Sequence, residues 1–433
     1  MWSLGNGSRD VKTISLAVAA MLLTTLLTAC EIDVQPSQAR WQMLERQGFQ
    51  FLLERTEDGY ISVAVSGYTG TGTEITIPTY LNNIPVTWIA FTAFRDRNLI
   101  NVTMPDTIVF IGDGAFYRNP LTNVLIPNSV RHIDRRAFAN NCLASVAIGD
   151  SVTIIGIEAF ANNQLAEVVL PNSVTHIGRS AFANNRLPEI TIPNSVTRIG
   201  EEAFSGNRLR EVTIPHGITS IGLNAFANNS ITNITLPSGM FSVGGFANNQ
   251  LAGVTIPDDI NQIDARAFAG NNLTEIDIPD SVRIIGEGAF EVNQLGSVAI
   301  PESVATIAPW AFARNFLGSV LIPQGLTSIG EGAFRENRLS DVSIPKGLTA
   351  IDAWTFAYNL LTEVIIPDKV IAIRHGAFEH NPITRIVIGE GVFLETRHGR
   401  GAFPNGFDAF YLENGSMAGT YVFDGGKWHA DAR

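Results

Sequence analysis

Apolar and polar residues along this chain follow a pattern that repeats every 22 residues. Counted from Leu99, thirteen units fit the template L-x-x-V-x-I-P-x-S-V-x-x-I-G-x-x-A-F-x-x-N-x, with a partial unit at 75–98 and a degenerate one opening at Ile383. One unit is two residues short between Gly244 and Gly245, at template positions 15 and 16, which predicts a trimmed surface turn. A single supersecondary unit is therefore repeated along most of the chain. Its phenylalanines are Phe94, Phe116, Phe138, Phe160, Phe182, Phe204, Phe226, Phe246, Phe268, Phe290, Phe312, Phe334, Phe356 and Phe378.

The template predicts two short extended segments and a turn in each unit. Alternating aliphatic residues at positions 4 and 6 favour a first strand, which the proline at position 7 ends because it has no N–H to donate. The V-x-x-I segment at positions 10–13 favours a second strand, and the I-G-x-x-A-F stretch is expected to form a helical or 3₁₀ turn. No unit can bury its own apolar residues, so successive units must stack. We predict an α/β-type solenoid, mostly β, with about 13 full coils and a parallel strand ladder.

Asparagine occupies position 21 in all thirteen units. A buried turn leaves backbone donors and acceptors that no strand satisfies, and an amide side chain can bond both kinds of group. We therefore predict a structural asparagine ladder between coils, with no catalytic role. Its members are Asn119, Asn141, Asn163, Asn185, Asn207, Asn229, Asn249, Asn271, Asn293, Asn315, Asn337, Asn359 and Asn381.

The N-x-L spacing and the IPxSVxxIGxxAFxxN pattern resemble the BspA-like, Treponema pallidum-type class of leucine-rich repeats. The resemblance covers 75–390, and many members of that class carry cysteine where this chain has asparagine. Residues 48–78 resemble the N-terminal β cap of the class. For 391–433 we predict a C-terminal cap of aromatic strands with turns at Asn414–Gly415 and Gly425–Gly426, so that β-hairpin caps close both ends. The resemblance implies adhesion to host matrix proteins or to other microbes.

The first residues resemble the signal peptide of a bacterial lipoprotein. Arg9 and Lys12 precede an apolar stretch from Ile14 to Leu27, and Leu27-Thr28-Ala29-Cys30 matches a lipobox. The resemblance implies cleavage after residue 29, acylation of Cys30 and a polar tether over 30–47. The alternative is an ordinary signal peptide with an incidental cysteine. We expect export and lipid anchoring to the bacterial envelope, at the outer membrane or cell surface rather than the inner membrane.

Composition narrows the possible functions. Lys and Arg number 29 against 41 Asp and Glu, a formal charge of −12, which argues against a nucleic-acid partner. The two cysteines, Cys30 and Cys142, exclude a disulfide scaffold and a cysteine-rich zinc site. His132 and His176 lie two coils apart, too far to share a zinc ion. No nucleophile elbow, phosphate loop or zinc-protease motif is present, so we predict neither cofactor nor enzymatic activity.

Candidate function therefore lies on outward rows of side chains. Positions 4 and 6 point inward, so positions 3 and 5 point outward. Position 5 is almost uncharged and position 3 carries several carboxylates but no basic residue, which favours a docking surface for an extended protein ligand. A second candidate is an aromatic patch, in which Trp310 and Trp354 share position 16. A solvated strand face and ordinary ring packing are the alternatives, and a periplasmic scaffolding lipoprotein is the alternative function. The candidate binding residues are Glu167, Glu189, Glu211, Thr191, Thr213, Thr235, Trp310, Trp354 and Tyr358.

Overall fold

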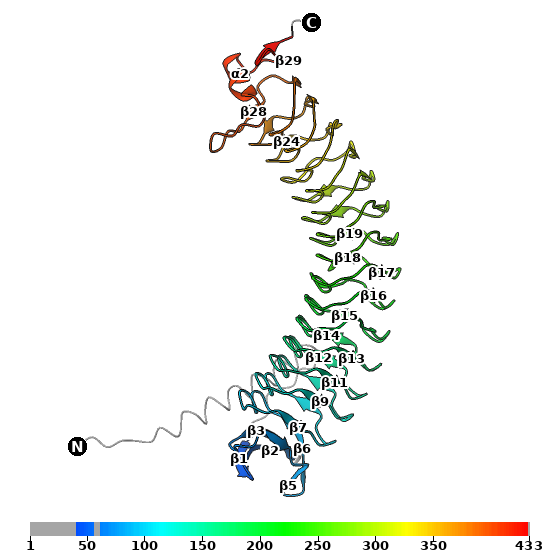
Figure 1. The fold of residues 1–433 in the computed structure, drawn as a ribbon, viewed down its shortest axis with the longest axis vertical. Helices are drawn as coiled ribbons and strands as arrows, with labels where there is room; N and C mark the ends of the chain where they lie inside the picture. Colours follow the sequence, from blue (N-terminus) through cyan, green and yellow to red (C-terminus); the bar gives the residue numbers. More distant parts are fainter. Residues whose placement is uncertain (1–39, 56–60, 432–433) are drawn as a thin grey trace, which may run out of the picture.

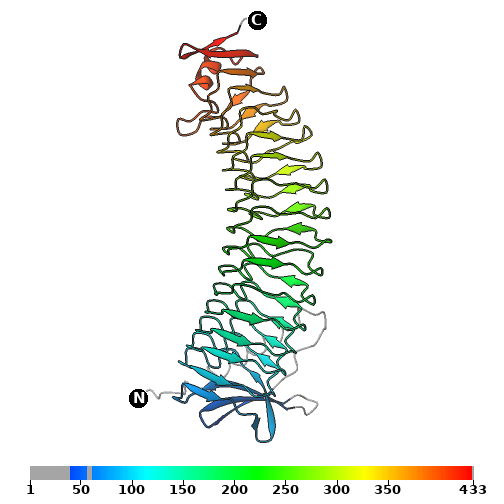
Figure 2. The ribbon, with the colours of Figure 1, turned by 45° about the vertical axis from the view of Figure 1, so that its right-hand side comes forward.

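The computed structural model describes residues 40–55 and 61–431 and shows one curved rod of stacked coils (Figure 1). The rod is a mostly β solenoid of about 15 turns, as the repeat predicted, and its short strands stack along the long axis (Figure 2). The predicted signal peptide and Cys30 lie outside the described residues. In the part of the chain that is described, no helix has both the length and the apolarity to span a membrane.

The second strands form the more continuous of the two parallel ladders. Neighbours pair in register, in most coils 22 residues apart, as in His132 with Ile154. The spacing is 20 across the short coil and 21 at the C-terminal end, and single bridges from Ile199 to Ile221 and from Ile307 to Ile329 extend the rows. These strands are β8 (Phe110–Ile111), β10 (His132–Ile133), β12 (Ile154–Ile155), β14 (His176–Ile177), β15 (Arg198–Ile199), β18 (Ser242–Val243), β19 (Gln262–Ile263), β20 (Ile284–Ile285), β22 (Thr306–Ile307), β24 (Ala350–Ile351), β26 (Ala372–Ile373) and β28 (Phe393–Leu394).

The first strands form a ladder that is interrupted. The segments 189–191, 253–255, 275–277 and 341–343 occupy the same template positions but do not pair as strands. The predicted parallel ladder is therefore present on this side only in part. Its strands are β4 (Glu74–Thr76), β7 (Asn101–Thr103), β9 (Asn123–Leu125), β11 (Ser145–Ala147), β13 (Glu167–Val169), β16 (Glu211–Thr213), β17 (Asn233–Thr235), β21 (Ser297–Ala299), β23 (Ser319–Leu321), β25 (Glu363–Ile365) and β27 (Arg385–Ile388).

A single column of phenylalanine rings runs through the core. From Phe94 to Phe378, and on to Phe403 in the C-terminal cap, neighbouring rings stack with centroids 4.9–6.1 Å apart. The rings from Phe94 to Phe378 are fully buried and pack among the aliphatic residues of the template. Offset stacking adds to the large apolar area that each ring removes from water. The column therefore binds each coil to the next.

The I-G-x-x-A-F stretch forms consecutive tight turns in place of the expected helical or 3₁₀ turn. Ala115 N donates to Gly112 O at 3.1 Å and Tyr117 N to Gly114 O at 3.0 Å. The intervening N–H groups point along the rod, so that Phe116 N donates to Ala137 O of the next coil at 2.8 Å. A helix would direct these donors within the coil, whereas here they link neighbouring coils.

The N-terminal cap begins earlier than the sequence indicated. Residues 40–46, assigned above to the tether, form β1 (Arg40–Arg46), which pairs antiparallel with β2 (Phe49–Arg55). β2 pairs with β3 (Ile61–Tyr68), and β3 pairs parallel with β6 (Ile84–Ile89), which continues into the second-strand ladder through β8. The short β5 (Tyr80–Leu81) pairs with β6.

The C-terminal cap is also different from the predicted pair of strands. Its first segment is a helix, α2 (Phe407–Glu413), followed by the hairpin of β29 (Gly419–Asp424) and β30 (Lys427–Ala430) around Gly425 and Gly426. The helix buries Phe407 and Tyr411 against the end of the core, a spacing of four residues that matches one helical face. β29 pairs antiparallel with β27 and so covers the edge of the first-strand ladder.

Candidate binding surfaces

The position-21 asparagines bond the backbone of two coils at once. Asn163 Nδ2 donates to Phe160 O of its own coil at 3.0 Å and to Phe138 O of the preceding coil at 2.9 Å. Its Oδ1 accepts from Leu143 N, the first residue of its own 22-residue unit, at 3.1 Å. The other twelve asparagines make the same three kinds of bond. The amides thus tie each turn to its neighbour through the backbone, and their polar groups are occupied.

Two positions of each full-length turn adopt a left-handed backbone whatever residue they carry. At position 16, Arg136, Glu158 and Trp310 have φ values of 52°, 55° and 60°. At position 20, Asn162 and Val292 both have φ 56°. Left-handed φ costs little for asparagine but is unusual for a β-branched residue. The stack of coils therefore imposes this conformation on residues that would not choose it.

The carboxylate and threonine candidates lie along the exposed first-strand face. Glu167 is on β13, Glu211 and Thr213 are on β16, Thr235 is on β17, and Glu189 and Thr191 lie in the unpaired coil between β13 and β16; all six side chains are exposed. No ion pair within 4.0 Å joins the three glutamates to a basic group of the described residues.

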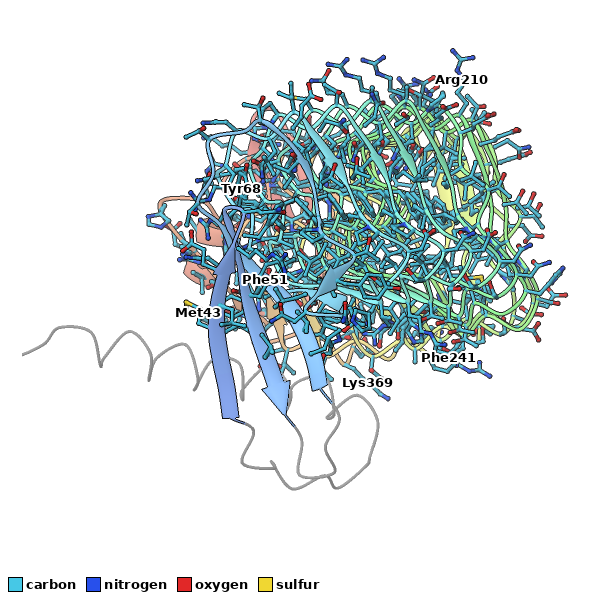
Figure 3. All side chains as sticks on the ribbon, turned by 90° about the horizontal axis from the view of Figure 1, so that it is seen from below. Met43, Phe51, Tyr68, Arg210, Phe241 and Lys369 are labelled. Atoms are coloured by element: carbon cyan, nitrogen blue, oxygen red, sulfur yellow. The ribbon has the colours of Figure 1, made fainter. Side chains whose placement is uncertain are left out.

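Large apolar side chains are exposed on the same face. They occupy position 5 and include Leu125, Val169, Leu321 and Ile365, whose exposed fractions are 69%, 80%, 71% and 59%. Seen along the rod in Figure 3, Arg210 of this edge projects away from Phe241 and Lys369, which lie at the opposite edge. The first-strand face is thus an extended surface of hydroxyl and apolar groups flanked by free carboxylates.

The three aromatic candidates are close together but largely covered. Trp310 and Trp354 are half-buried, and each ring lies against the glycine one coil further on, where a Cβ on Gly332 or Gly376 would come within 2.7 Å of it. The Arg335 guanidinium lies 5.5, 5.1 and 5.0 Å from the ring centroids of Trp310, Trp354 and Tyr358. These stacked contacts use the ring faces that a partner would need.

The repeat and its turn geometry place the protein in a known family. The sequence profile described as the BspA type leucine rich repeat region, in six copies, matches residues 68–188, 175–296 and 284–403. The chain belongs to the BspA-type leucine-rich repeat family. The resemblance inferred from the sequence is therefore confirmed.

Solved structures show the same fold at low sequence identity. A leucine-rich repeat protein from Bacteroides ovatus is 20% identical with a TM-score of 0.57, over 83% of this chain and 89% of that one. The pneumococcal vaccine antigen PcpA is 19% identical with a TM-score of 0.52, over 83% of this chain and 92% of its own. No curated protein sequence matches the chain.

A half-buried carboxylate lies beside the short coil of this BspA-type chain. Where the two residues are missing, the Asp264 side chain of the next coil lies over Gly244. Its carboxyl accepts hydrogen bonds from Ser242 Oγ at 3.0 Å and Gln262 Nε2 at 2.8 Å. Burial raises the pKa of Asp264, and these two bonds oppose the rise. The group is fully engaged within the protein.

The histidines make separate contacts. His375 Nδ1 lies 3.3 Å from Glu395 Oε2, and His380 stacks on Tyr358 with centroids 4.2 Å apart. His132 stacks on Phe110, and burial lowers its pKa. Within residues 40–55 and 61–431, no group of His, Cys, Asp and Glu has the arrangement of a metal site. Cys142 is exposed.

The structure also contains two hollows that the sequence analysis did not find. One, of about 590 Å³, follows the turns after the second strands at the C-terminal end. Asp352, Arg374 and Glu395 line it, and the Arg374 guanidinium forms ion pairs of 2.9 Å with Asp352 and 3.9 Å with Glu395. The other, of about 580 Å³, lies on the first-strand face between Asn233 and Asp277. Its signals in the sequence were Gly253, the one glycine at position 3, and Asp277, the one charged residue at position 5.

Proposed function

We propose that this chain is a non-catalytic, lipid-anchored surface protein whose solenoid binds protein ligands along the first-strand face, in adhesion to host matrix or to other cells. The observation that carries the proposal is the exposed strip of threonine and large apolar side chains at position 5, flanked at position 3 by carboxylates. Glu167, Glu189 and Glu211 form no ion pair in the described residues, whereas Glu363 pairs with Arg385. Isolated exposed apolar residues are common, but a row of them repeated along a rigid ladder is a regular surface that suits an extended partner.

The anchor and the fold are compatible with this role. The described fold begins at Arg40, ten residues after Cys30, in the cap at one end of the rod. Acyl chains at Cys30 would hold only that end, because stable attachment by lipid needs no contact with the solenoid. The long face then stays available to a ligand. Membership of the BspA-type family and likeness to a pneumococcal vaccine antigen support surface exposure.

Two measurements test the proposal. Protease added to intact cells should cleave the solenoid without rupture of the envelope; cleavage only after rupture would favour the periplasmic scaffold instead. The soluble chain from Glu31 should bind at least one member of a panel of immobilised matrix proteins. Thr213→Arg should weaken that binding about tenfold by placing a bulky cation on the face. Thr219→Arg, in the same coil but on the other edge, is the matched control and should bind as the parent does.

A further inference from the structure

The crevice on the first-strand face coincides with a local break in strand pairing. Before it, Ile214 N donates to Thr235 O at 3.0 Å, and after it, Ile300 N donates to Leu321 O at 3.0 Å. The first-strand segments of the two intervening coils, 253–255 and 275–277, form no strand. The ladder therefore opens at this point over two coils and closes again beyond them.

The opening exposes part of the apolar core as a floor. At template position 4, Val212 and Val298 on either side are 2% and 4% exposed, whereas Ile234, Val254 and Ile276 are only half-buried. Gly253 adds depth, since a Cβ built on it would meet no atom within 4 Å. The floor is thus accessible to an aliphatic chain.

One side of the crevice is acidic. Glu275 and Asp277 are both exposed, and neither lies within 4.0 Å of a basic group in the described residues. Both project from the outward side of one segment, because residues two apart share a face. Asp277 is the only charged residue in the position-5 row. The one charge of this row therefore lies where the strand pairing is interrupted.

An apolar floor beside free carboxylates suits a side chain with an aliphatic stem and a cationic head. Lysine and arginine have this form and bury their methylene groups while the charge stays at a polar boundary. We propose that the crevice between Asn233 and Asp277 receives a lysine or arginine side chain from an extended partner segment. That the chain has such a protein partner rests on the proposed function, but the fit between the crevice and a basic side chain does not.

The probe is a short, blocked, fluorescently labelled peptide of alternating valine and threonine with lysine at its centre, matched by peptides with norleucine or glutamate there. Binding to the soluble chain from Glu31 is followed by fluorescence anisotropy. The lysine peptide should bind about fivefold to tenfold more tightly than the norleucine peptide, and the glutamate peptide more weakly than either. The preference for lysine should shrink as sodium chloride rises from about 50 mM to about 500 mM.

Variants locate the site. Gly253→Leu should fill the crevice and weaken binding of the lysine peptide about tenfold. Gly318→Leu, at another exposed glycine on the same face, should leave this binding unchanged. The double variant Glu275→Gln with Asp277→Asn should remove the preference for lysine over norleucine, and Glu302→Gln, an exposed carboxylate outside the crevice, should keep it. Equal binding of the lysine and norleucine peptides, or no effect of Gly253→Leu, would overturn the inference. If the chain prefers the lysine peptide but binds no matrix protein, the inferred crevice site is supported and the proposed adhesive function is contradicted.

Discussion

From Asn119 to Asn381 each coil ties its turn to the preceding one with the same asparagine bonds, whereas the first strands pair in some coils and not in others. On the turn side, the asparagine amides and the phenylalanine column repeat without a break, even through the coil that lacks two residues. On the first-strand side, coils with the same alternating pattern differ: Val212 lies in a paired strand and Ile190 does not.

The difference shows which side determines the spacing of the coils. Buried polar groups and large rings tolerate little change in distance, because a lost hydrogen bond or a cavity costs free energy. Three-residue strands on the outer face contribute few bonds, so neighbouring first strands can separate while the turns stay in place. The turn side therefore holds the solenoid together, and the first-strand side can vary more from coil to coil.

Removing one ring from the column should give the largest effect. Phe204→Ala deletes a fully buried side chain between two stacked rings and should lower the free energy of unfolding by about 3–5 kcal/mol. Phe241→Ala, where 60% of the side chain is exposed, should change it by less than about 0.5 kcal/mol. Urea unfolding followed by circular dichroism measures both. Similar losses for the two variants would contradict the assignment of stability to the column.

Breaking one asparagine tie should cost less. Asn185→Leu keeps the size of the side chain but leaves Leu165 N without its acceptor. It also removes one of the two amide donors to Phe160 O and to Phe182 O, which keep their bonds from Asn163 and Asn207, and the expected loss is about 1–3 kcal/mol. Asn172 is exposed and makes no side-chain bond among the described residues, so Asn172→Leu is the control and should be nearly neutral. If Asn185→Leu and Asn172→Leu have the same melting temperature, the asparagine bonds do not stabilise the turns as argued.

Much of this architecture could be predicted because buried residues recur at a fixed interval along the sequence. Phe204, the inward aliphatic residues and Asn185 recur at fixed template positions, and physical chemistry gives each position one role. The outward placement of Glu211 and Thr213 followed from the alternation of a strand. The targets of the amides were less evident: they are backbone groups of two coils, and no bond between two of these amides is present in the described part.

Other features depend on how coils sit against each other, which one unit of sequence does not encode. The left-handed turn residues include Glu158 and Trp310, so residue identity gave no signal. The break at Gly253 arises in a coil whose Val254 and Ile256 follow the usual alternation. In the C-terminal cap, Phe407 and Tyr411 suit a strand as well as a helix, and contact with the end of the core decides between them.

Relieving strain in a turn should give the smallest of these effects and with the opposite sign. Val292 is held at φ 56° at position 20, where several other coils carry asparagine or glycine, and its side chain is 47% exposed. Val292→Asn gives up little burial and removes most of the cost of a branched residue in this conformation, so it should raise the free energy of unfolding by about 1 kcal/mol. Val169→Asn, at a strand position that is 80% exposed, has no such strain to lose and should not stabilise. If thermal unfolding shows no gain for Val292→Asn over Val169→Asn, the stack does not impose the turn conformation against the preference of its residues.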